Sequence, residues 1–451
     1  MLDHGLGLGL TSVWIAVVLG AAVAAFRRPD MGIYVLIPLL PNQTLREKLH
    51  LMPYGDQAID MLLLGITIGV WLRYRDIVPR SALRRPLIAI FILTFATLWL
   101  GSVQNNLPLP LSFENIRFSD WKNYCRVLFL VFLTQRAIRT RTQMFVVVLV
   151  MCVGVALAER EFIQNSRDMT FDTFSYDKRN AGSMPEAGEN GLAAFLAEAS
   201  LFLVAFAISR DAFLRWILTA FGIFTAGCMV MVFSRGAYLA YPMAFIVLGV
   251  LRRRTLVIVT LAVLITAIIA GASFIPGAVI QRATMTHDQS GALEGSAAQR
   301  LVMWTLVMNL FYQYPLFGAG YDTVKFLVSY AGLANAHNYY VQLLGEMGLA
   351  GLLSFVWLLA AALVSSWKLH RRATDRTLQA IAAGSLSCLA AIIVLNFFGD
   401  RWSYVEITGY TAVMLGMVQR GLELVEGEIS AEELDQAGLI PEEESSLVPV
   451  S

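Results

Sequence analysis

The chain has 451 residues, of which 57% are hydrophobic and only 15% charged, and its formal net charge is +1. A typical soluble domain carries about 25% charged residues, so this composition argues against a soluble globular enzyme. The near-neutral charge, with no basic stripe or arm, argues against a nucleic-acid partner. Because about 20 apolar residues span a bilayer as a helix, the recurring apolar blocks predict an all-α, polytopic membrane protein.

The apolar runs give the expected helices in chain order. No Lys or Arg precedes the first run, while Arg27 and Arg28 follow it, which favours a retained helix over a cleaved signal. The run at 31–41, bounded by Pro29 and Pro41, is too short to span the bilayer upright, so we expect about 12 or 13 transmembrane helices. The runs are 8–26, 31–41, 58–72, 86–103, 121–135, 142–158, 191–208, 214–233, 236–251, 255–275, 338–367, 377–397 and 403–419.

Lys and Arg in the short loops predict the orientation of the chain. They form four clusters, and the predicted spans put all four on one side of the membrane, which is then the cytoplasmic side. The longest loop falls on the opposite side. The clusters are Arg73/Arg75/Arg80/Arg84/Arg85, Arg136/Arg139/Arg141, Arg252–Arg254 and Lys368/Arg371/Arg372/Arg376.

The spans divide the chain into four regions. Residues 1–275 carry the N-terminal transmembrane helices, 276–337 form a large loop on the side opposite the basic clusters, and 338–419 carry the C-terminal transmembrane helices. Residues 420–451 form an acidic cytoplasmic tail, expected to be partly disordered. Within the loop, apolar residues at helical spacing from Ala298 to Tyr312 predict an amphipathic helix, lying either on the membrane surface or on the bundle.

Three residues at the predicted outer face are the first candidates for chemistry. Arg235 lies between two apolar runs, and its planar guanidinium suits phosphate oxygens; an interfacial Arg reaching the headgroups is the ordinary alternative. Arg300 opens the amphipathic stretch, near a helix N-terminus that would favour phosphate, although an exposed loop Arg is the simpler reading. His337 precedes a long apolar helix, and its ordinary pKa of about 6.5 suits a general base; a lone His is more often structural.

Further candidates rest on weaker patterns. Glu346 is a carboxylate inside an apolar helix, which makes it a functional candidate by default. The turn from Phe317 to Asp322 can bring its backbone close to a ligand, but it lacks the strand and helix of a nucleotide-binding fingerprint. Helix capping and headgroup contacts are the ordinary explanations for the polar candidates at helix ends. The remaining candidates are Lys122, Arg126, Glu189, Asn190, Gly318, Gly320, Asp322 and Asn338.

The outer loops contain no cluster of His, Cys or Asp with the spacing of metal ligands. We therefore expect a mechanism without a metal or another cofactor.

Three stretches, taken together, resemble the O-antigen ligase and O-antigen polymerase superfamily of bacterial envelope glycosyltransferases. A fourth, Glu189-Asn-Gly-Leu-Ala193, is similar to the family's acidic–Asn–x–Leu–Ala stretch, although Gly188 departs from the residues often seen beside it. The three are Ser234-Arg-Gly-Ala237, the segment from Arg300 to Trp304 followed by Tyr314 to Gly320, and the segment from Ala336 to Gly351.

The resemblance implies a type C glycosyltransferase fold in the bacterial inner membrane, with its active site at the periplasmic face. The implied donor is a glycan on undecaprenyl diphosphate, transferred without a metal and with inversion at the anomeric carbon. By the same resemblance, Arg235 and Arg300 would bind the donor diphosphate, and His337 would act on the acceptor hydroxyl as a base or an orienting group. Membrane lipids would surround the protein.

The acceptor separates three activities within the superfamily. It would be lipid A–core for a ligase, a growing glycan for a polymerase, and Ser or Thr for a protein O-oligosaccharyltransferase. The lack of a large soluble acceptor-binding domain slightly favours the first two. A lipid-linked glycan flippase is the alternative from another class, and it would require internal repeats and interrupted helices near the membrane midplane.

Overall fold

The protein is built from helices, which the computed structural model describes over residues 2–75, 81–252, 254, 255, 258, 276–285, 295–330 and 332–436. No β-strand occurs among these residues. The α-helices are α1 (Leu2–Phe26), α2 (Pro29–Leu39), α3 (Gln43–Lys48), α4 (Ala58–Tyr74), α5 (Arg84–Gln104), α6 (Ile116–Ala137), α7 (Arg141–Asn165), α8 (Gly188–Ile208), α9 (Ala212–Met231), α10 (Arg235–Arg252), α12 (Gly277–Thr284), α13 (Gly295–Gln313), α14 (Val324–Leu327), α15 (Tyr339–Arg372), α16 (Arg376–Leu395) and α17 (Val405–Gln436). Short 3₁₀ turns occupy Leu49–Leu51, Gly55–Gln57 and Tyr176–Lys178.

Eight helices in the described part of the chain are long and apolar enough to cross a membrane: α1, α4, α5, α7, α8, α9, α15 and α16. This confirms the predicted all-α, polytopic membrane protein. Helices α6, α10 and α17 coincide with further predicted spans but fall short of the same criterion, and α2 has only 11 residues. The predicted span 255–275 lies outside the described residues, apart from residues 255 and 258. The expected total of about 12 or 13 spans therefore stays a prediction.

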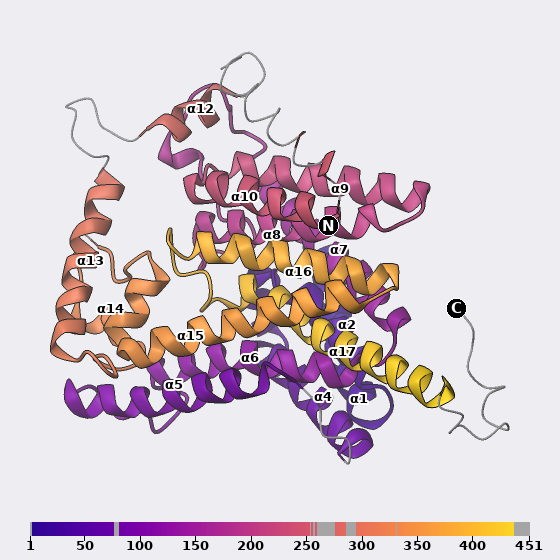
Figure 1. The fold of residues 1–451 in the computed structure, drawn as a ribbon. Coiled ribbons are helices and arrows are strands. Elements are labelled where there is room, and N and C mark those ends of the chain that lie inside the picture. Colours follow the sequence, from indigo (N-terminus) through magenta and orange to yellow (C-terminus); the bar gives the residue numbers. More distant parts are fainter. Residues whose placement is uncertain are drawn as a thin grey trace.

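The long helices run side by side as a bundle, and α12, α13 and α14 stand at one end of it (Figure 1). Helix α8 lies inside the bundle: 94% of its apolar stretch is buried, and α9, α10 and α16 pack on it. Small residues permit this close packing, as they do in membrane bundles generally. In α16, for example, a Cβ at Gly384 would lie 2.5 Å from the Phe202 ring of α8.

The basic loops gather at the end of the bundle away from α13 and α14. Contacts join them to one another and to the end of α17, which supports the prediction that the basic clusters share one side. Arg80 and Arg253 of these clusters lie outside the described residues. The contacts are Arg136 to the backbone oxygen of Tyr74, Arg252 to Gln379 (2.9 Å), Arg372 to Glu426 (3.4 Å) and Arg141 to Glu428.

Helix α17 continues well past the predicted end of the last span at residue 419. The acidic tail predicted from residue 420 is thus helical as far as Gln436, and residues 437–451 lie outside the described part. Acidic side chains of this extension meet the basic loops: Glu426 pairs with Arg372 (3.4 Å) and Glu428 pairs with Arg141. These pairs explain why a charged segment extends the helix instead of leaving it.

Helix α15 is interrupted at Gly348, whose φ of 62° and ψ of −157° are not helical. A neighbouring loop fills the interruption. The amide of Leu349 donates to the oxygen of Pro315 (2.9 Å), and the amide of Gly320 donates to the oxygen of Glu346 (2.8 Å). The residues before the break, which form the N-terminal end of α15, are therefore held by the loop that precedes α14.

Replacing Gly348 with alanine should destabilise the protein. This backbone conformation is almost confined to glycine, and a Cβ would lie 2.5 Å from the carbonyl carbon of Leu316. Strain of this kind costs about 1–3 kcal/mol before any clash is counted. We expect a clear fall in the thermal unfolding midpoint in detergent. The matched control is Gly227→Ala in α9, where a Cβ would meet open space and where helix propensity predicts a small gain.

Candidate active site

A pocket of about 500 Å³ lies at the α12–α13 end of the bundle. It brings together Arg235 and Arg300, which are far apart in sequence, and Asn190, another predicted site residue. We call it the arginine pocket. Its lining residues are Asn190, Ser234, Arg235, Gly236, Tyr238, Leu239, Arg282, Ala283, Ala297, Arg300, Leu301, Trp304, Phe397 and Phe398.

Arg235 is the first residue of α10, so its side chain leaves the helix where backbone amides are still free of helical partners. Its Nη1 donates to the backbone oxygen of Met285, just after α12. The following glycine allows the turn to pack closely, because a Cβ at Gly236 would lie 2.8 Å from the Cβ of Phe398. The Ser-Arg-Gly sequence therefore fixes the guanidinium at the pocket wall.

Arg300 lies in the second turn of α13, which begins at Gly295 rather than at the arginine itself. The predicted helix from Ala298 to Tyr312 is present and packs on α15. On the face towards α15, Met303 and Val307 are buried, whereas Leu301 is 47% exposed. Gly345 of α15 lets Val307 approach closely, because a Cβ there would lie 2.4 Å from Cγ1 of Val307.

His337 is held by a segment whose backbone is hydrogen-bonded on both sides of the histidine. Trp304 of the arginine pocket donates from Nε1 to the oxygen of Ala336 (2.7 Å), and the amide of Ala336 donates to Gln342 (3.0 Å). The amide of His337 donates to Oδ1 of Asn335 (2.7 Å). These bonds keep His337 at a left-handed φ of 48°, which is uncommon outside glycine.

The ring of His337 is available for chemistry. Burial, followed by the charges of Arg300 and Arg401, lowers its pKa from 6.5 to about 4, so the imidazole is neutral at pH 7. No hydrogen bond to either ring nitrogen occurs among the described residues. The next residue, Asn338, has a structural role: its Oδ1 accepts from the amides of Tyr340 (3.1 Å) and Val341 (3.3 Å), which caps α15.

Residues 220–356 match a protein-family model described as O-antigen ligase. This segment is therefore similar to the O-antigen ligase family. They include Arg235, Arg300 and His337, the three residues that the resemblance singled out. No curated protein matches the chain. The family points to an enzyme of the ligase or glycosyltransferase type that works in a membrane on lipid-linked glycans.

The O-antigen ligase segment contributes a third arginine to the pocket, Arg282 of α12, which sequence reasoning missed. Its side chain is only 4% exposed and lies over the rings of Phe174 and Tyr176, at 4.9 and 5.3 Å. Its Nε donates to the oxygen of Phe233 (3.4 Å), which precedes Arg235 by two residues. No motif marks this residue, because its place depends on aromatic rings about 100 residues away in the sequence.

Two further cations near the pocket lie outside the O-antigen ligase segment. Arg179 donates to Asn190 (3.0 Å) and pairs with Glu189 (3.7 Å), so these two predicted site residues hold an arginine at the pocket. Arg401 is 5% exposed, and burial lowers its pKa to about 10, with smaller contributions from the charges of Arg300 and Arg179. Mutual repulsion of this kind is relieved when an anion binds.

Four of the weaker candidates lie away from the arginine pocket. Lys122 and Arg126 both bind Asp60, at 3.1 and 2.7 Å. Gly318 and Gly320 line neither this pocket nor the second cavity described below. A Cβ at Gly320 would lie 2.2 Å from the Cα of Gly101, so the close approach that this glycine permits is to another helix.

A second cavity, of about 680 Å³, is lined in part by Asn335 and Tyr339 of the segment that carries His337, although His337 itself is in the lining of neither cavity. Among the predicted site residues it contains Arg126, Asp322 and Glu346. We call it the acid-lined cavity. Its lining includes Arg46, Asp120, Arg126, Glu186, Tyr321, Asp322, Lys325, Ala334, Asn335, Tyr339, Gln342, Glu346, Asp400, Tyr404 and Glu406.

The low pKa of His337 depends on its cationic neighbours, which gives a prediction. In Arg300→Met, one charge that disfavours the imidazolium is gone, so the pKa of His337 should rise from about 4 towards 6.5. NMR titration of ¹⁵N-labelled histidine in detergent measures this, with the His337→Gln spectrum giving the assignment. Arg376→Met, which removes an exposed arginine paired with Asp211 at the opposite end, should leave the titration unchanged. An unchanged pKa in Arg300→Met would contradict the electrostatic account.

Proposed function

We propose that this protein transfers a glycan from undecaprenyl diphosphate to an acceptor hydroxyl, as an O-antigen ligase or as a polymerase of O-antigen or exopolysaccharide. The observation that carries the proposal is the arginine pocket beside a neutral His337. Several arginines meet in this pocket around a space large enough for a diphosphate and its first sugar, and one segment ties its wall to the histidine.

The proposed reaction is a single displacement. The acceptor oxygen forms a bond to the anomeric carbon as the bond from that carbon to the diphosphate oxygen breaks, which inverts the configuration. The acceptor proton passes to the free ring nitrogen of His337, or His337 only orients the hydroxyl. Negative charge grows on the departing diphosphate, and Arg235 and Arg300 stabilise it as preorganised donors. Since these arginines supply the positive charge, we propose that no metal takes part.

The proposed location is the periplasmic face of the bacterial inner membrane. Both cavities lie at the end of the bundle opposite the basic loops, and basic loops mark the cytoplasmic side of membrane proteins.

Within the described residues, no group of three or more His, Cys, Asp or Glu side chains is arranged to hold a metal ion.

The test uses the purified full-length protein in nanodiscs with a glycan on undecaprenyl diphosphate and with EDTA present. Product on lipid A–core would identify a ligase, longer lipid-linked chains a polymerase, and product on Ser or Thr a protein O-oligosaccharyltransferase. If no glycan moves to any acceptor while labelled lipid crosses the bilayer, the enzyme proposal fails and a flippase takes its place.

A further inference from the structure

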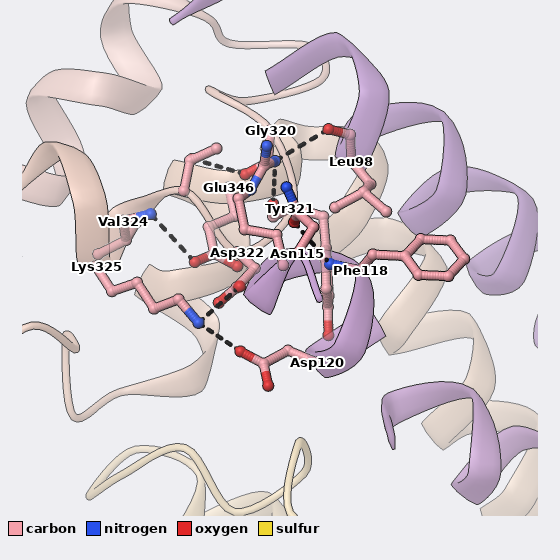
Figure 2. A network of polar contacts seen from close by, with 12 residues as sticks. Leu98, Asn115, Phe118, Asp120, Gly320, Tyr321, Asp322, Val324, Lys325 and Glu346 are labelled. Atoms are coloured by element: carbon pink, nitrogen blue, oxygen red, sulfur yellow. Dashed lines mark hydrogen bonds and ion pairs between the residues drawn. The ribbon is translucent and has the colours of Figure 1, made fainter. Parts of the chain in front are cut away.

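The acid-lined cavity has an unusual balance of charge. Besides the residues named above, Glu47, Asp56 and His50 line it, which gives eight carboxylates against three Arg or Lys side chains, Arg46, Arg126 and Lys325. Each of the three basic side chains already pairs with a carboxylate: Arg46 with Glu406, Arg126 with Asp60 (2.7 Å), and Lys325 with Asp322 (2.8 Å) and Asp120. Figure 2 shows Lys325 between its two partners. No cation in this lining is left to bind an anionic ligand.

Carboxylates, by contrast, remain without cationic partners. Glu186, Glu346 and Asp400 line the cavity and form no ion pair with any described residue. Glu346 and Asp400 are 7% and 9% exposed, so each is more than nine-tenths buried. A buried carboxylate favours ligands that donate hydrogen bonds to it and disfavours other anions.

Tyr321 gives a second, independent indication that the cavity binds a ligand. Its side chain lines the cavity and is 7% exposed, yet no hydrogen bond to its hydroxyl occurs among the described residues. The backbone at this position is fixed, because buried Arg117 donates to the oxygen of Tyr321 (2.7 Å) and the Tyr321 amide donates to Thr97 (3.2 Å). Buried tyrosine hydroxyls usually have a partner, and here a ligand can supply it.

The acid-lined cavity adjoins the segment that carries His337. Ala334, Asn335 and Tyr339 belong to its lining, and Asn335 accepts the amide hydrogen of His337. The other side of the same segment is joined to the arginine pocket through Trp304. The segment therefore lies between a cationic pocket and an acidic cavity, an arrangement that matches a reaction of two substrates of different charge.

We propose that the acid-lined cavity binds the acceptor, and that the accepting end is a saccharide without phosphate or carboxylate groups. Its hydroxyl groups would donate to Glu186, Glu346 and Asp400, and the Tyr321 hydroxyl would bond to the same saccharide. A phosphorylated sugar would meet like charges and find no unpaired Arg or Lys side chain, so its binding would be weaker. This inference rests on the glycan transfer proposed above, and it adds which cavity takes the acceptor and which charge is excluded.

Direct binding tests the assignment without requiring turnover. The purified full-length protein in nanodiscs is titrated with neutral trisaccharides of hexose and 2-acetamido-hexose units and with their 6-phosphates, followed by saturation-transfer NMR. We expect the neutral sugars to bind at least about 10-fold more tightly than the phosphates. Tyr321→Phe removes a hydroxyl with no protein partner and should weaken neutral binding roughly 3- to 10-fold. Tyr312→Phe, at a position 71% exposed, is the matched control and should have no effect.

The results separate this inference from the proposed function. Equal binding of neutral and phosphorylated sugars, binding of neither, or equal binding by Tyr321→Phe and Tyr312→Phe would overturn the acceptor assignment, even if glycan transfer is observed. Selective, Tyr321-dependent binding without transfer to any acceptor would reject the transferase proposal and keep the saccharide site. Glu186→Gln offers a second variant. It removes one negative charge, so the ratio of the affinity for the neutral sugar to that for its 6-phosphate should fall.

Discussion

His337→Ala should lower the rate constant for glycan transfer by roughly 10²–10⁴-fold, the usual contribution of a positioned general base. The imidazole is neutral at pH 7, its ring nitrogens have no partner among the described residues, and its backbone is fixed on both sides. The loss should fall on kcat, while the apparent KM for the lipid-linked donor changes little, because the arginine pocket stays intact.

The measurement is the initial rate of transfer with saturating donor. His370→Ala is the control, since this histidine lies in the last turn of the same helix, at the end with the basic loops. His337→Gln separates the two proposed roles: an orienting residue should retain part of its effect as an amide, whereas a base should not. A kcat within about 3-fold of wild type in His337→Ala would remove the residue from the mechanism.

Arg235→Met and Arg300→Met should each reduce transfer by roughly 10²–10³-fold, by analogy with the loss of one oxyanion-hole donor. The proposed reaction places the departing diphosphate beside both guanidinium groups, in a pocket that also contains Arg282. Lysine replacements should recover only part of the rate, because an ammonium lacks the planar fork that grips two phosphate oxygens.

For each variant, both the rate of glycan transfer and the affinity for the lipid-linked donor are measured. Arg376→Met is the control, as its side chain is 75% exposed and pairs with Asp211 at the opposite end of the bundle. A variant that loses donor affinity but keeps kcat would limit that arginine to ground-state binding. Full activity in both variants would place the diphosphate elsewhere.

The sequence predicted the bundle because apolar length and the placement of Lys and Arg are local signals. It missed the break in α15, since the apolar run at 338–367 continues across Gly348 and hydropathy carries no information about φ. The same limit explains the turn with Gly318 and Gly320: a sequence shows that a backbone can approach something closely, but not that the neighbour is α5 and the broken end of α15.

The sequence identified only those residues of the candidate site that lie in short motifs. Arg235, Arg300 and His337 lie in short motifs, so a resemblance could select them, and the structure brings the two arginines into one pocket. Arg282 and Arg401 have no such motif. Their positions arise from long-range packing, on Phe174 in one case and in a buried turn in the other, which no spacing of residues records.

In the proposed reaction, the break at Gly348 would set the depth of the site in the membrane. Residues 349–372 alone form a helix about 36 Å long, enough to traverse a hydrocarbon layer of about 30 Å. The half-helix from Tyr339 to Met347 would then extend into the headgroup region. There a hydrophilic sugar chain would arrive from water along the membrane surface, while the prenyl chain of the proposed donor stayed in the hydrocarbon layer.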